Sequence, residues 1–356
     1  MKKALLSAAC LLAIAFPVHG DVRAIYTLLE SESYSEIAPI KQLLDDLKGP
    51  AFDRGDLAFT HNQFEIGERR GSWEVSAFLR YDYLLEFSND TAELAYADKN
   101  DKELEKQRNY QLYLEPNHLR AKGLGLAYYI DLPANSHLKL RANYLRAEAL
   151  TDGTLRGQLR TLDDRVEADL VLDYNYSRDA LLKREEENMR GNGLSIDIDL
   201  HWQFARQWSL DIAARDLASE IRWNDVTYTR ATAISNTVSY DDDGFIDVKP
   251  TVSGIEGYRD HSQTLPRRIA TTLSHQWRSN VAFSAGLRSV DKYLFPQLKA
   301  SWVQAGTQWQ LGVDIEQQAL MFGVNYQGLK VDLESDAFKP DDAKTFGLRL
   351  SYQWLL

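Results

Sequence analysis

The sequence is poor in sulfur, with one cysteine (Cys10) and three methionines in 356 residues. A single cysteine excludes an intrachain disulfide and a zinc site built from several thiolates. There is no run of about 20 apolar residues, which excludes a bundle of transmembrane helices. The formal net charge of −11 disfavours nucleic-acid binding, because phosphate groups are neutralised by concentrated Lys and Arg.

The first twenty residues have the composition of an export signal. Lys2 and Lys3 precede an apolar stretch from Leu5 to Phe16, and Val18-His19-Gly20 follows as the cleavage site, with small residues at positions 18 and 20. The stretch is too short for a membrane anchor, so residues 1–20 are predicted to be a signal peptide for Sec-type export. Its removal leaves no cysteine and 39 basic against 52 acidic residues, a mature net charge of −13.

Residues 21–56 are predicted to form a separate N-terminal segment with one short helix. Ser35 is placed to cap the helix, and Gly49–Pro50 end it. The apolar residues expected on one helix face are Ile37, Ile40, Leu44 and Leu47. Two interpretations stay open: a helix that plugs the fold or docks in the periplasm, and a helix that simply packs on the remaining structure.

From Leu57 onward the apolar residues alternate with polar ones. The segment from Trp73 to Phe87 alternates over 15 residues, and residues 166–176 and 194–204 do the same. Alternation predicts strands with one apolar and one polar face. Strands of a sandwich are usually about 5 to 6 residues long, whereas crossing a bilayer takes about 9 to 11 tilted residues. The segment lengths therefore favour membrane-spanning strands.

Short and long connections between these segments mostly alternate, as in bacterial barrels with short periplasmic turns and long outer loops. Residues 162–164 count among the short turns, residues 177–192 and 224–266 among the long loops, and residues 151–153 as a brief outer turn. The prediction is all-β: residues 57–356 form a transmembrane, antiparallel, up-and-down β-barrel of about 14 to 16 strands, preceded by the short helix.

The last strand is amphipathic to the C-terminus. Its apolar face carries Phe346, Leu348, Leu350, Tyr352, Trp354 and Leu356. This strand resembles the terminal strand of Gram-negative outer-membrane barrel proteins, although the usual terminal Phe is replaced by Trp354-Leu355-Leu356. The resemblance implies recognition by periplasmic chaperones and the barrel assembly machinery, location in the cell outer membrane, and contact with outer-membrane lipid.

The polar faces of the strands supply candidates for lining the lumen. They are Arg80, Asp82, Lys139, Arg141, Asp169, Asp173, Asp197, Asp199, Asp211, Arg215, Asp314 and Arg349. Both signs of charge occur, with acids in excess. One interpretation is a polar pore for small solutes, with acidic rings favouring cations. The other is a lumen closed by salt bridges and by the N-terminal helix.

Signals for metal binding and catalysis are weak. Asp241, Asp243 and Asp247 surround Gly244, and such hard oxygen ligands suit Ca²⁺. The full 12-residue spacing and closing Glu are missing, so a solvated loop tip is favoured and no other cofactor is predicted. His261 beside Asp260 could join Asp241 or Asp243, but nucleophile motifs are absent. No catalytic residue is predicted.

The predicted function is that of an outer-membrane channel or passive transporter for small solutes or hydrophobic compounds. The architecture resembles porins and, through the helix that could plug the lumen, the long-chain fatty-acid transporters. Two alternatives remain: a non-conducting barrel that binds partners or assists assembly, and a surface hydrolase. Substrate, lumen state and oligomeric state stay open.

Overall fold

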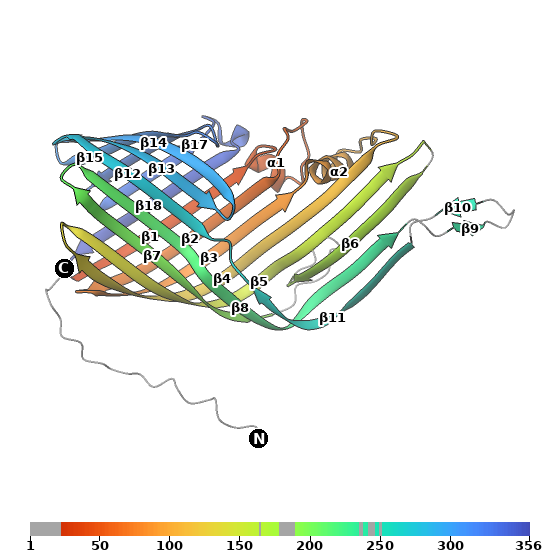
Figure 1. Ribbon diagram of the computed structural model, residues 1–356, viewed down its shortest axis with the longest axis horizontal. Helices are drawn as coiled ribbons and strands as arrows, with labels where there is room; N and C mark the ends of the chain where they lie inside the picture. Colours follow the sequence, from red (N-terminus) through yellow and green to blue (C-terminus); the bar gives the residue numbers. More distant parts are fainter. Residues whose placement is uncertain (1–22, 164, 178–188, 235–237, 241–245, 249–250) are drawn as a thin grey trace, which may run out of the picture.

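The computed structural model describes residues 23–163, 165–177, 189–234, 238–240, 246–248 and 251–356. The predicted signal peptide lies outside these residues. Fourteen antiparallel strands form a closed barrel, which confirms the predicted fold class (Figure 1). The first and last strands, β1 (Arg23–Ser35) and β18 (Thr345–Leu355), pair from Ala24 opposite Leu355 to Tyr34 opposite Thr345 and close the ring.

The other barrel strands follow one another around the ring in chain order. They are β2 (Leu57–Arg70), β3 (Trp73–Phe87), β4 (Asn109–Leu132), β5 (Ser136–Thr161), β7 (Gly191–Ala205), β8 (Trp208–Ile234), β12 (Arg268–Arg278), β13 (Val281–Val290), β14 (Tyr293–Gln304), β15 (Thr307–Asp314), β16 (Ala319–Tyr326) and β17 (Leu329–Ser335). Among the described residues, no helix is long and apolar enough to cross a membrane.

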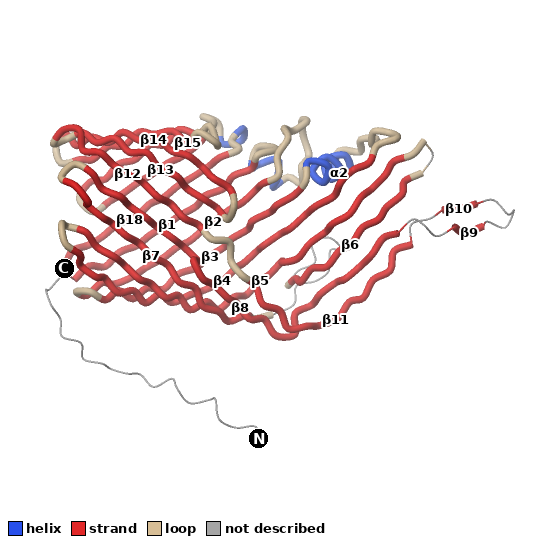
Figure 2. The backbone as a smooth tube through the Cα atoms, viewed as in Figure 1, coloured by secondary structure: helices blue, strands red, loops and turns tan. Residues whose placement is uncertain are grey.

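One side of the barrel is much taller than the other. Strands β4, β5 and β8 have 24, 26 and 27 residues, whereas β15 and β17 have 8 and 7. The tall strands run on past the rest of the barrel, where β6 (Val166–Tyr176) lies between β5 and β8 and β11 (Thr251–Gln263) pairs with the outer half of β8 (Figure 2).

The tall wall corrects four expectations about connections. Residues 162 and 163 follow β5 at the tip of the β5–β6 hairpin, at the end far from the termini, because β5 continues for 26 residues; residue 164 lies outside the described residues. Residues 151–153 lie inside β5 and not in a turn. Most of the expected loop 224–266 is the outer half of β8 together with β11. Of the expected loop 177–192, residues 178–188 lie outside the described residues, Ser177 follows β6 within the wall, and residues 191–192 begin β7.

The expected boundary at residue 56 is also wrong, because β1 belongs to the barrel. Its inward residues include the apolar Leu28 between Tyr26 and Glu30, and this breaks the polar–apolar alternation. Helix α1 spans only Ile40–Leu44 at the end far from the termini, and Leu44 is 80% exposed. Asp46 and Leu47 have positive φ, which ends the helix before the expected face is complete.

The two ends of the barrel differ in their connections. Two- or three-residue turns join strands at the end where both termini lie, and at residues 305–306 both φ values are positive, as tight hairpins require. The far end carries α1, α2 (Asn89–Lys99) and the 3-10 turn η1 (Pro340–Asp342). Both helices lie at the rim in Figure 1, beside the tall wall.

The outer and inner faces follow strand parity. Outward side chains such as Leu79, Leu124, Leu311 and Phe322 are 39 to 62% exposed and apolar. The inner face carries both charged groups and two apolar clusters. This distribution of an apolar outer belt and a mixed interior is the reverse of that in a soluble protein, where the outer surface carries most of the charged side chains.

Candidate functional site

The termini-end half of the lumen is a cavity of about 1140 Å³. Its lining extends from the turns at Asn280 and Gly328 to Arg80 and Arg268 in the middle of the barrel. Eight of the twelve lumen candidates line it: Arg80, Lys139, Arg141, Asp197, Asp199, Asp211, Arg215 and Arg349. The cavity is therefore strongly charged, with cations and anions intermixed on the same walls.

The remaining four candidates lie elsewhere. Asp82 and Asp314 are on the inner wall outside the lining of this cavity, and Asp314 accepts a hydrogen bond of 2.9 Å from Gln297. Asp169 and Asp173 are on β6 in the tall wall, where Asp173 pairs with Arg259 at 2.7 Å. The tall wall thus carries its own ion pair, beyond the cavity.

A buried ion network crosses the middle of the barrel. Arg80 on β3 donates two hydrogen bonds, of 2.9 and 2.6 Å, to Asp216 on β8. These strands are separated by β4, β5 and β7, so the side chains meet across the lumen. Arg80 also donates to Asp82 at 2.5 Å, and Asp82 contacts the ring of His61. Arg80 and Asp216 are 7% and 1% exposed.

A second set of polar contacts lines the wall nearer the termini. Arg141 on β5 donates to Glu65 on β2 at 2.7 Å, and Lys139 donates to Glu74 on β3 at 2.8 Å. The Tyr26 hydroxyl lies 2.6 Å from Glu65 and 3.0 Å from Glu74 and bridges the two carboxylates, whose charges Arg141 and Lys139 balance. Buried charges persist only when paired and hydrogen-bonded, so these contacts hold one wall of the cavity rigid.

An apolar cluster crosses the far half of the lumen. Tyr34 and Phe59 come from β1 and β2, and Phe295 comes from β14 on the opposite side. The ring centroid of Phe295 lies 5.6 Å from that of Tyr34 and 5.9 Å from that of Phe59. Since four strands separate β1 from β14 along the ring, this contact narrows the lumen. Leu57, Leu84 and Val290 complete the cluster.

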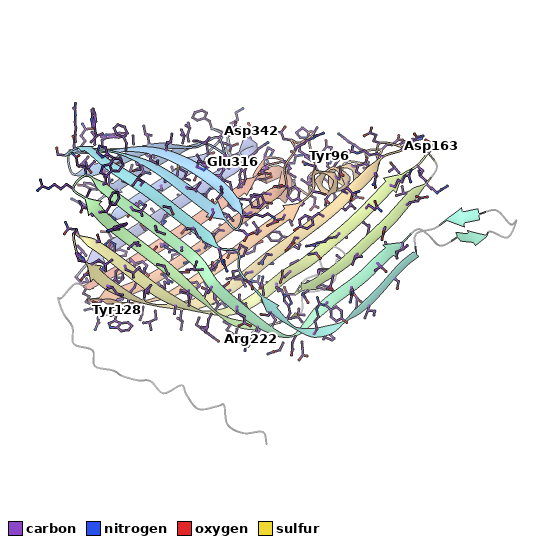
Figure 3. All side chains as sticks on the ribbon, in the orientation of Figure 1. Tyr96, Tyr128, Asp163, Arg222, Glu316 and Asp342 are labelled. Atoms are coloured by element: carbon purple, nitrogen blue, oxygen red, sulfur yellow. The ribbon has the colours of Figure 1, made fainter. Side chains whose placement is uncertain are left out.

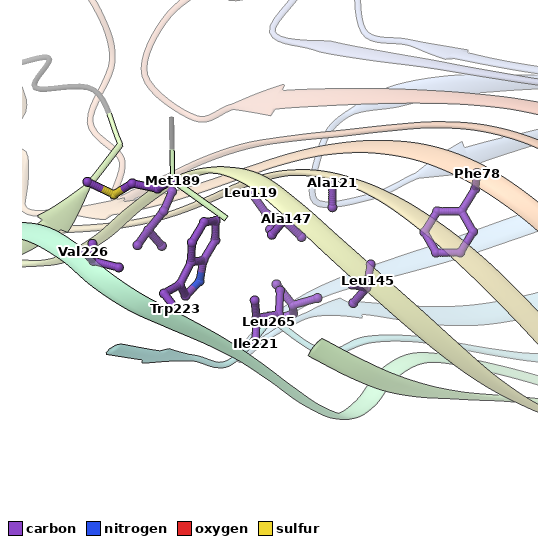
Figure 4. Close-up of a cluster of buried hydrophobic side chains, with 11 residues drawn as sticks. Phe78, Leu119, Ala121, Leu145, Ala147, Met189, Ile221, Trp223, Val226 and Leu265 are labelled. Atoms are coloured by element: carbon purple, nitrogen blue, oxygen red, sulfur yellow. The ribbon is translucent and has the colours of Figure 1, made fainter. Parts of the chain in front are cut away.

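A larger apolar cluster fills the base of the tall side (Figure 4). Trp223 and Ile221 on β8 are 1% and 0% exposed and pack with Leu119, Leu145 and neighbouring residues of β3 to β5. The Trp223 ring nitrogen donates to Gln263 at 3.2 Å, which satisfies its only polar atom. The interior of this barrel is therefore partly a hydrophobic core, unlike a water-filled pore.

The segment between β1 and β2 caps the inner face at the far rim. Ile37 and Ala38 are buried against Phe87 and Ala92. Lys344 donates to Asp53 at 2.5 Å, and this hydrogen bond holds the pKa of Asp53 below its usual range. This segment packs at the rim, so it neither enters the termini-end cavity nor projects from the termini end.

The proposed partner of His261 differs from expectation. Its Nε2 lies 2.6 Å from Asp152 on β5, across the tall wall. Asp241 and Asp243 fall outside the described residues, and Asp247 lies in the short strand β10 (Ile246–Val248), which pairs with β9 (Val238–Tyr240). Over the part of the chain that the structure describes, no group of three His, Cys, Asp or Glu is placed to hold a metal ion.

The predicted assembly signal forms the barrel's closing strand. On the outer face of β18, Phe346, Leu350 and Trp354 are 38 to 45% exposed. Leu348 and Tyr352 occupy alternate positions on the same face, and Leu356 follows the end of the strand. Recognition of this strand by the assembly machinery and by chaperones stays a prediction.

The sequence pattern missed several residues of the ion network. Glu65 and Glu74 alternate with outward apolar residues and follow the same parity rule as the chosen candidates. Asp216 does not, because a bulge in the pairing of β7 with β8 places it on the same face as Arg215. No local signal marks such a bulge, so only the folded register reveals that Asp216 faces Arg80.

No family model matches the chain, and no curated protein matches it in sequence. Among solved structures, a deltaS2S3 mutant of the monoaromatic hydrocarbon channel TodX aligns over 95% of this chain and 91% of its own, with 9% identity and a TM-score of 0.48. The toluene transporter TodX of P. putida covers 95% and 91% at 8% identity and TM-score 0.43. The Ralstonia pickettii toluene transporter TbuX covers 95% and 90% at 11% identity and TM-score 0.30. Similarity at this level does not identify the solute of this chain.

Proposed function

We propose that the chain is a passive outer-membrane channel or transporter for small solutes of hydrophobic character. The outer belt of the closed barrel is apolar, as contact with lipid hydrocarbon requires. Bacterial barrels of even strand number place both termini in the periplasm. On that basis the charged cavity opens toward the periplasm, and the tall wall with α2 stands outside the cell.

The observation that carries the proposal is the division of the lumen into two chemical zones. A solute entering from outside meets the aromatic cluster of Tyr34, Phe59 and Phe295 before it meets the ion network at Arg80. A general porin for hydrated solutes has a polar interior throughout. Apolar side chains facing inward favour a compound that can leave water, such as a small aromatic or aliphatic molecule.

A second candidate is a barrel that conducts nothing. The side-chain contacts of Arg80 with Asp216 and of Tyr34 with Phe295 both cross the lumen, which supports a closed state. In the channel proposal these contacts must separate during passage. In the alternative they are permanent, and the tall outer wall is the functional surface. An enzymatic role is the least favoured, since among the described residues no nucleophile is hydrogen-bonded to His261 or Asp152.

Transport by purified protein in liposomes separates these candidates. Phe295→Ala removes the ring that closes the aromatic cluster, and Phe283→Ala removes an outward ring 49% exposed on the adjacent strand as the matched control. We expect uptake of a small aromatic probe to exceed uptake of a sugar of similar size, and to rise in Phe295→Ala alone. Equal, background uptake of both probes by every variant contradicts the channel and favours the closed barrel.

A further inference from the structure

The outer face of the tall side carries an apolar groove of about 450 Å³. It crosses β2 to β5, and its lining includes Phe64, Ile66, Leu79 and Leu124, all outward and 47 to 62% exposed. The groove is hollow because Ala77 presents only a methyl group between larger outward neighbours in the same row, Ile66 and Leu124. Tyr144 on β5 completes that row.

Cations follow directly above this apolar row. The next row of cross-strand partners, one step closer to the end far from the termini, runs from Phe64 and Leu79 to Lys122 on β4 and Arg146 on β5. Lys122 and Arg146 also line the groove. The row continues through Asn192 on β7 to Arg222 on β8, which projects from the outer wall (Figure 3).

Arg120 adds a third cation beside the groove. It lies two residues beyond Lys122 on β4, about 7 Å further along the same face. Lys122 pairs with Glu148 at 2.8 Å. Within the described part of the chain, Arg120 and Arg146 are exposed and form no ion pair. Glu148 also attracts both guanidinium groups, so the three cations and this carboxylate together leave a local excess of two positive charges at the top of an apolar belt, in a chain whose net charge is −11.

We infer that this groove binds a phosphorylated lipid of the outer leaflet, with one acyl chain over Ala77 and a phosphate on Arg120 and Arg146. The apolar row matches hydrocarbon, and the guanidinium groups match phosphate, which they bind with paired hydrogen bonds. The height of the cations along the barrel also matches that of a lipid headgroup, because they lie where the apolar belt gives way to the polar tall wall. The inference rests on the proposed membrane location but is independent of transport.

Native mass spectrometry of the detergent-solubilised full chain tests the site with diphosphorylated lipid A as probe. We expect the wild type to retain one lipid A, and Arg120→Ala/Arg146→Ala to weaken binding by about tenfold or more. Arg120→Lys/Arg146→Lys keeps the charge and is expected to retain most binding. Arg70→Ala removes an outward cation at the opposite rim, where it pairs with Glu68 at 2.7 Å, and is expected to change nothing.

Two further measurements make the result decisive. Ala77→Trp fills the groove, and we expect it to weaken lipid A binding while the boiled and unboiled forms still migrate differently on a gel, as folded barrels do. Dephosphorylated lipid A is expected to bind weakly. Unchanged binding in the double alanine variant, equal binding of the dephosphorylated lipid, or displacement of lipid A by equimolar inorganic phosphate would each overturn the site. A change in solute uptake in these variants bears on the channel and not on the groove.

Discussion

At the scale of single residues, the lumen is organised by charges that meet across it. Arg80 satisfies two carboxylates, Asp82 and Asp216, and all three lie in the middle of the barrel. Such a network is costly to bury but more costly to break, because one missing partner leaves an uncompensated charge. The network therefore fixes which strands face one another more than it adds net stability.

Asp216→Asn tests this directly. It replaces one of the two carboxylates that Arg80 contacts by a neutral amide, and we expect the free energy of unfolding to fall by about 3 to 5 kcal/mol. The triple variant Arg80→Met/Asp82→Leu/Asp216→Leu removes the arginine together with both of its carboxylates and should recover part of that loss. Urea titration in detergent or vesicles, followed by tryptophan fluorescence, measures both. A single variant as stable as the wild type would mean that water solvates this pair.

At the scale of elements, the tall wall protects one of its edges and exposes the other. Helix α2 lies along the free part of β4, where Asp90 accepts from the backbone N–H of Gln111 and Thr91 from that of Tyr113. Covering an edge in this way prevents pairing with another chain. On the opposite edge, β11 has β8 as its strand partner in the described structure. The tall wall is therefore held together by the pairing of β6 with β5 on one side and with β8 on the other.

Gly157→Ala is expected to loosen this wall. Gly157 on β5 has φ of +141°, and an added Cβ would lie 2.0 Å from the backbone oxygen of Asp169 on β6. The substitution combines strain with a backbone clash, so we expect a loss of more than about 1 kcal/mol. The measurement is the rate of tryptic cleavage at Arg160 and Arg165, which should rise.

The control for this experiment is Gly286→Ala on β13. An added Cβ there meets its nearest neighbour, Thr272, at 3.4 Å, and φ is unexceptional. Its cleavage pattern is expected to match the wild type. Equal protease resistance of both variants would show that β6 does not hold the tip of β5.

At the scale of the whole molecule, parity decides the environment of every side chain in the short strands. Leu311 on β15 is outward and 49% exposed, whereas its neighbour Gln310 lines the cavity. An outward position near the middle of such a short strand faces hydrocarbon if the barrel is inserted, and the adjacent position faces water.

Adjacent arginine substitutions therefore have opposite consequences. Leu311→Arg places a charge in lipid and is expected to cost about 2 to 4 kcal/mol, with less protein in the heat-modifiable form after insertion into vesicles. Gln310→Arg places the same charge in the cavity and should fold nearly as well as the wild type. Equal folding yields for the two variants would contradict the membrane belt.

Much of the architecture follows from local patterns along the sequence. Alternation over more than ten residues, as in β3 and β18, predicts membrane strands, and it assigns residues such as Arg141 and Asp199 to the inner face. It fails where the inner face is itself apolar, as at Leu28 in β1, and in β8, where a bulge turns Asp216 inward.

The sequence by itself determined the type of fold, because the period of two is a property of neighbouring residues and lipid allows only closed sheets. The tertiary structure alone decided which groups meet across the lumen, such as Arg80 with Asp216 and Tyr34 with Phe295. It also placed Ala77 beneath the cations of β4 and β5. Those relations depend on ring closure and on the register between strands, and no local stretch of sequence encodes either.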